Sequence, residues 1–120
     1  MSELKLAVKQ GEEINVGFTI KENGNPMDLS SYTIHFQVKR APLVSAPAIV
    51  DKSITATSDI NTVGMINYPL RGQFVVHLGV DDTSFPTGEY SLIIALEQEG
   101  LIDIISSKCC NKAIYKICEQ

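Results

Sequence analysis

The sequence contains no tryptophan and only three cysteines, Cys109, Cys110 and Cys118, which crowd the C-terminus. Because the first ten residues, MSELKLAVKQ, lack the apolar segment of a signal peptide, an odd number of cysteines predicts free thiols. The stretch KCCNKAIYKIC also lacks the paired C-x-x-C spacing that is typical of a zinc site. We therefore expect plain structural cysteines that form neither a disulfide nor a metal site.

Long apolar runs and an excess of positive charge are missing as well. No apolar run approaches the roughly 18 residues that a membrane helix needs. Ten Lys and Arg against 14 Asp and Glu give a formal net charge of -4, whereas nucleic-acid binding through phosphates needs a basic face. We expect a protein made in the cytoplasm that binds neither a membrane nor a nucleic acid.

Histidine is scarce, with two residues in the chain. His35 and His77 fall at outward positions of two predicted strands, where they could meet across a sheet and bind a metal with Asp81 or Asp82 nearby. A metal site also needs a third ligand and groups that orient the ligands. We therefore expect two solvated histidines and no metal.

The sequence offers no catalytic constellation. Adjacent residues of a strand point to opposite faces, so Asp81 and Asp82 do not form a facing carboxylate pair, and we expect them to serve a turn or a cap. The serine pairs Ser30–Ser31 and Ser106–Ser107 lack the glycine-flanked turn of a serine nucleophile. We expect a protein that is not an enzyme and binds no cofactor.

What the sequence does contain is an alternation of apolar and polar residues with a period of two, which is typical of half-buried strands. In residues 13–22, the apolar side chains of Ile14, Val16, Phe18 and Ile20 share one face. Comparable strands are predicted over residues 31–40, 72–80, 90–98, 101–108 and 112–120, and a short one over residues 51–59. Residues 41–50 are predicted as a loop or edge segment, residues 60–72 are ambiguous, and residues 81–89 are predicted as a loop with one helical turn.

These segments predict an all-β fold, an antiparallel immunoglobulin-like β-sandwich of seven to eight short strands. The length fits a single domain over residues 1–120. A small closed barrel is the alternative architecture.

The stretch PMDLSSYT stands directly ahead of the strand over residues 31–40. Asp28 and the two serines can bond their own backbone and set a turn. We expect Leu29 to enter the core and Tyr32 to begin the strand, so the stretch forms a corner between the two sheets.

The order of these elements resembles the N-terminal domain of the phage baseplate upper protein family, a structural β-sandwich module of tailed phages. The resemblance covers residues 14–100 and rests on a turn that leads into a strand and on a later strand–turn–strand unit. The matching positions are Gly24, Pro26, Asp28, Leu29, Tyr32, Gly72, Thr83, Gly88 and Tyr90. The resemblance implies a scaffold role inside a virion, often in an oligomer, and no catalytic residues.

Several apolar residues fall at positions that should be polar on a solvated antiparallel face. Either a loop covers a central strand pair, or these residues form a subunit interface, which the resemblance favours. On the second interpretation the strands over residues 72–80 and 90–98 share one sheet, and the interface comprises Val75, Ile93, Ala95, Leu101 and Ile105.

The expected function is that of a phage or prophage virion structural protein, a baseplate, tail or head module. It would be made in the cytoplasm of a bacterial host and assemble with itself, with other virion proteins, or with both. The alternative is a monomeric module that binds a carbohydrate or a host surface. That alternative favours exposed aromatic residues, but four of the eight Phe and Tyr residues fall at inward positions, namely Phe18, Phe36, Phe74 and Tyr90.

Overall fold

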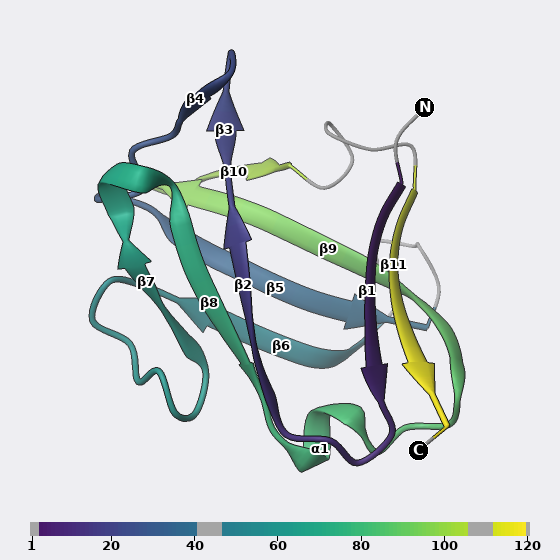
Figure 1. Ribbon diagram of the computed structural model, residues 1–120. Helices are drawn as coiled ribbons and strands as arrows, with labels where there is room; N and C mark the ends of the chain where they lie inside the picture. The colour runs from purple at the N-terminus through teal and green to yellow at the C-terminus, as the bar shows by residue number, and fades with distance from the viewer. Residues whose placement is uncertain (1–2, 41–46, 106–111, 120) are drawn as a thin grey trace.

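The computed structural model describes residues 3–40, 47–105 and 112–119, and it consists mainly of β-strands (Figure 1). The larger sheet has the order β1-β11-β9-β5-β6, and β10 pairs with β9. The smaller sheet has the order β2-β8-β7. The strands of the larger sheet are β1 (Glu3–Lys9), β5 (Thr33–Lys39), β6 (Ala48–Ile54), β9 (Gly88–Gln98), β10 (Leu101–Ile104) and β11 (Lys112–Cys118). The strands of the smaller sheet are β2 (Ile14–Thr19), β7 (Gly64–Tyr68) and β8 (Gln73–Leu78).

Short elements join the strands within and between the two sheets. The two-residue strands β3 (Lys21–Glu22) and β4 (Asn25–Pro26) form a small hairpin that extends β2. A 3-10 turn, η1 (Pro69–Arg71), joins β7 to β8, and one helical turn, α1 (Val80–Thr83), follows β8 and leads toward β9. The described part of the chain is therefore all-β apart from these two turns, as the sequence predicts.

The core lies between the two sheets, which pack face to face. Figure 1 shows β2, β8 and β7 in front of the strands of the larger sheet. The Phe18 ring of β2 lies 6.3 Å from the Phe36 ring of β5 in the opposite sheet and stacks on Phe74 of β8 at 5.2 Å. The alternating residues predicted to point inward are buried, including Ile34, Phe36, Val38, Phe74, Val76, Leu78, Tyr90, Leu92, Ile94 and Leu96.

Two details of the predicted fold are wrong, and a third is confirmed in part. Eleven strands are present in the described residues, two of only two residues, where seven to eight were expected. The sheets are not wholly antiparallel, because β1 runs parallel to β11 from Glu3↔Lys112 to Lys9↔Cys118. Residues 48–50, predicted as a loop or edge segment, begin β6, which is indeed at a sheet edge.

The corner at PMDLSSYT forms as the sequence predicts. The Asp28 carboxylate accepts the backbone N–H of Ser30 at 2.9 Å and the Ser30 hydroxyl, and these bonds hold the pKa of Asp28 below its ordinary value of 3.8. Leu29 is fully buried, and its N–H donates to the carbonyl of Pro69 at 2.9 Å. The corner therefore ties the start of β5 to η1, the turn between β7 and β8 of the smaller sheet.

A polar network closes the opposite end of the sandwich. Lys52 is paired with Phe36 and so points between the sheets, where its Nζ lies 2.8 Å from Asp82 Oδ2 and donates to the Thr62 carbonyl. The Tyr115 hydroxyl donates to the Asp82 carbonyl at 2.9 Å. Burial first, and the Asp82 charge second, raise the pKa of Tyr115 well above its ordinary value of 10.0. An inward lysine on an edge strand also discourages pairing with another chain.

Candidate functional site

The outer face of the larger sheet carries a strip of apolar side chains, Ile93, Ala95, Ile102 and Ile104, called here the outer strip. Leu92, Ile94 and Leu96 of β9 are buried in the core, so Ile93 and Ala95 point to the other face. In the β9–β10 pair, Ala95 lies opposite Ile104 and Glu97 opposite Ile102. Because paired residues share a face, the four apolar side chains follow one another across β9 and β10.

The outer strip is more exposed toward β10. Ile102 is 63% exposed and Ile104 43%, Ile93 is half-buried, and Ala95 is buried. At its border, His35 Nε2 lies 2.6 Å from Glu97 Oε1. Gln37 Nε2 donates to Asp51 Oδ1 at 3.4 Å on the same face. Two exposed isoleucines bordered by paired polar groups resemble an interaction surface, with an apolar centre and a polar rim.

The interface predicted from the sequence does not form one patch. Val75 belongs to β8, in the smaller sheet, where it lies between Gly17 and Met65 on the opposite outer face of the molecule. The expectation that residues 72–80 and 90–98 share a sheet is therefore wrong. The physical reason is that α1 and residues 84–87 carry the chain from one sheet to the other, although β8 and β9 are consecutive strands.

Two further residues of that prediction lie elsewhere. Leu101 is 78% exposed but lies opposite Gln98, on the face of Leu96 rather than of Ile93. Ile105 donates its N–H to the Ile94 carbonyl at 2.9 Å, and its side chain packs against the core. Of the five predicted residues, Ile93 and Ala95 remain in the outer strip, and Ile102 and Ile104 were missed.

The remaining motif residues have structural roles. The backbone φ of Gly24, Gly72 and Gly88 is positive, and Pro26 pairs with Lys21 in the β3–β4 hairpin. Thr83 is fully buried, and its hydroxyl donates to the Glu12 carbonyl at 2.7 Å. The Tyr90 hydroxyl donates to the Pro86 carbonyl at 2.6 Å, and Tyr32 is half-buried just before β5. These residues position turns and strand ends.

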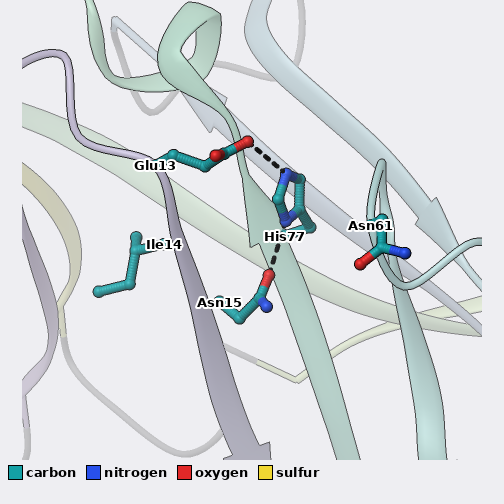
Figure 2. A pocket seen from close by; sticks show the side chains of 5 residues that line it. All are labelled: Glu13, Ile14, Asn15, Asn61 and His77. Carbon is teal, nitrogen blue, oxygen red and sulfur yellow. Dashed lines mark hydrogen bonds and ion pairs between the residues drawn. The ribbon is translucent and has the colours of Figure 1, made fainter.

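A shallow polar depression of about 340 Å³ lies on the outer face of the smaller sheet, lined by Glu13, Ile14, Asn15, Asn61 and His77. Figure 2 shows the His77 ring between Glu13 and Asn15, with Asn61 on the other side. Its Nδ1 lies 2.6 Å from Asn15 Oδ1, and its Nε2 lies 3.4 Å from Glu13 Oε2. Both ring nitrogens thus have partners within the chain, and the contacts join β2 to β8.

The candidate metal ligands His35 and His77 lie apart, and Asp82 has a capping role. His35 and His77 lie on opposite outer faces, in different sheets, so they cannot share a metal. Within residues 3–40, 47–105 and 112–119, no group of three His, Cys, Asp or Glu side chains could hold a metal ion. Asp82 accepts the Gly79 N–H at 2.8 Å and so caps α1, whereas Asp81 is exposed.

Several predicted residues fall outside the described ones, namely Ser106, Ser107, Cys109 and Cys110. Cys118 is described, and it is a free, half-buried thiol. No helix in the described ranges is long and apolar enough to cross a membrane.

Comparison with known proteins finds similarity among solved structures. No protein-family profile matches the chain, and no curated protein matches it. Among solved structures, the chain is similar to the N-terminal domain of phage TP901-1 ORF48, with 14% sequence identity and a TM-score of 0.48. The match covers 100% of both chains.

Proposed function

We propose that the protein is a non-enzymatic structural module that assembles through the outer strip, in a phage or prophage virion. The observation that carries this proposal is the exposure of Ile102 and Ile104 beside Ala95 on one face of the β9–β10 hairpin. Burying an isoleucine side chain contributes roughly 1.5–3 kcal/mol. In a symmetric pair of subunits each such contact occurs twice, so a small strip can hold an oligomer. The virion role itself rests on the resemblance in residues 14–100.

The fold supports an immunoglobulin-like assignment. Strands β2, β8 and β7 would correspond to B, E and D, and β11, β9, β5 and β6 to G, F, C and C′. The Tyr90 hydroxyl, near the start of β9, bonds the carbonyl of Pro86 four residues upstream, as in the tyrosine corner of strand F. Such sandwiches present their sheet faces and edges to partners, which suits an assembly module.

The alternative is a monomeric module that binds carbohydrate through the depression around His77. Its lining contains hydrogen-bonding groups but no Trp, Tyr or Phe ring on which a sugar could stack. Tyr68 is 52% exposed, but the Arg71 guanidinium lies over its ring at 5.3 Å. The assembly proposal is therefore favoured.

Replacing Ile102 with lysine should dissociate the oligomer while the fold is retained. The side chain is 63% exposed, so a lysine there reaches water in the monomer but would be buried without a partner in the interface. We expect light scattering to give an oligomer mass for the wild type at tens of micromolar and a monomer mass for Ile102→Lys, with unchanged circular dichroism.

A matched control is Leu70→Lys, since Leu70 is 74% exposed in η1, away from the outer strip. This variant should keep the wild-type mass. A wild type that stays monomeric would reject self-association, and equal effects of both variants would show that the outer strip has no special role.

A further inference from the structure

One edge of strand β2 has no partner strand among residues 3–40, 47–105 and 112–119. Among the described strands it pairs with β8 alone, from Ile14↔Leu78 to Thr19↔Gln73. Just beyond the strand, the Ile20 N–H donates to the Gly72 carbonyl at 2.8 Å, on the β8 side. Successive residues direct their backbone groups to opposite edges of a strand, so residues with even numbers bond β8. The N–H and C=O groups of Asn15, Gly17 and Thr19 therefore point to the open edge.

The hydrogen bonds of β8 agree with this alternation. The His77 N–H donates to the Val63 carbonyl at 3.1 Å, toward β7 and away from Asn15, its partner residue in β2. The Asn15–His77 pair is therefore held by its side chains, and the backbone groups of Asn15 are directed away from β8. The open edge thus presents a regular row of donors and acceptors.

Strands β1, β6 and β7, at the ends of the two strand orders, each carry a feature that discourages pairing with another strand, and β2 carries none of these features. On β1, Lys5 and Lys9 are exposed at the edge, and on β6 the inward Lys52 forms an ion pair with Asp82. The register of β7 shifts between Met65 and Tyr68. Charged residues and irregular register are common devices that block addition of another strand. Strand β2 has six residues, no proline, no lysine and no register shift.

The core-facing side chains along this edge are incompletely covered. Ile14, Val16, Phe18 and Ile20 pack against the core but are only half-buried, whereas their β8 partners Leu78, Val76 and Phe74 are fully buried. A strand added beside β2 would cover this apolar surface and satisfy the open backbone groups at once, as in strand addition to other sheet edges.

We infer that the β2 edge binds an extended segment of a partner protein, which adds to the smaller sheet as an antiparallel strand. The charges at its two ends specify the partner's chemistry, since Glu13 precedes β2 and Lys21 follows it. Opposite charges that face each other across strands are stabilising and like charges are destabilising. The segment therefore carries an acidic residue near its N-terminal end, a basic residue near its C-terminal end and apolar residues at alternate positions between them.

The sequence of residues 13–21, EINVGFTIK, itself has this pattern and provides the probe. Aligned antiparallel to β2 and centred on Gly17, a synthetic nonapeptide of this sequence places its lysine opposite Glu13 and its glutamate opposite Lys21. The matched control peptide, KINVGFTIE, has the same composition but places like charges opposite each other. The probe is used below its own aggregation threshold.

Nuclear magnetic resonance of the full chain tests the inference. In the free protein, the amides of Gly17 and Thr19 should exchange with solvent faster than those of Val16 and Phe18. Addition of EINVGFTIK should slow exchange at Gly17 and Thr19, and KINVGFTIE should bind about tenfold more weakly. In the variant Glu13→Lys/Lys21→Glu this preference should reverse. No binding of either peptide up to about 1 mM, or equal binding of both, would overturn the inference.

A backbone variant provides a second readout. Gly17→Pro removes the N–H that points to the open edge and leaves the β2–β8 ladder intact, and proline is tolerated on edge strands. We expect circular dichroism to remain that of the wild type and peptide affinity to fall about tenfold. Ile102→Lys should leave peptide binding unchanged, because the outer strip lies on the other sheet. The two proposals can therefore fail independently.

Discussion

Phe74→Ala should lower the free energy of unfolding by about 3–5 kcal/mol, the usual range for deleting a fully buried phenylalanine. Phe74 is 1% exposed, and its ring stacks on Phe18 at 5.2 Å between the two sheets. Small domains are stable by only about 5–15 kcal/mol. Thermal denaturation followed by circular dichroism should therefore show a fall of about 12 °C or more in Tm.

Phe18→Ala is the matched control for this prediction. It deletes the other ring of the same stacked pair, but Phe18 lies on the edge strand β2 and is half-buried. We expect a loss of about 1–2 kcal/mol, since less apolar surface is withdrawn from water at this site. Equal losses for the two variants would contradict the position of the core between β8 and β5.

Gly72→Ala should destabilise the domain by about 3 kcal/mol or more. Gly72 has a φ of +66°, and a Cβ atom there would lie 2.3 Å from the Ile20 carbonyl oxygen and 3.0 Å from that of Met27. The left-handed conformation itself costs an alanine roughly 1–2 kcal/mol. The remainder comes from displacement of backbone at Ile20, whose N–H donates to Gly72 and whose carbonyl accepts the Met27 N–H.

Gly24→Ala separates these two causes. Gly24 has a φ of +83°, but a Cβ atom there would meet no other heavy atom within 4 Å, because the residue lies at the exposed tip of the β3–β4 hairpin. We expect a loss of about 1 kcal/mol from backbone strain alone. Urea denaturation of both variants gives the comparison, and a Gly72→Ala variant as stable as Gly24→Ala would show that η1 does not pack closely on the end of β2.

Much of the fold follows from the sequence, because apolar and polar residues alternate clearly along a strand that has one buried face. The inward residues of β2, β5, β8 and β9 are those that the alternation predicts. Strand β1 was missed although Leu6 and Val8 alternate with Lys5, Ala7 and Lys9 in the same way. Its pairing with β11 is parallel and joins the two ends of the chain, and no local signal in either strand specifies so distant a partner.

The candidate site was predicted only in part, because the register that the β9–β10 turn imposes on Ile102 and Ile104 was not worked out. Glu99 and Gly100 have φ values of +53° and +81° and form a two-residue turn, so Gln98 pairs with Leu101. From this turn the pairing continues residue by residue until Ile104 lies opposite Ala95. This register can be derived from the sequence alone, because the length of the turn fixes it. The separation of Val75 from Ile93 could not be found in this way, because assignment of a strand to a sheet depends on packing between distant segments.

Isoleucine-methyl nuclear magnetic resonance of the wild type over a dilution series tests the assembly proposal most directly. Between about 10 µM and about 1 mM, the methyl signals of Ile93, Ile102 and Ile104 should shift or broaden together, because these side chains become buried between subunits. Ile66, which is 2% exposed in the smaller sheet, should stay unchanged as the internal reference. Unchanged signals of the outer strip in a protein that light scattering shows to be monomeric over this range, or changes confined to the smaller sheet, would contradict assembly through the β9–β10 face.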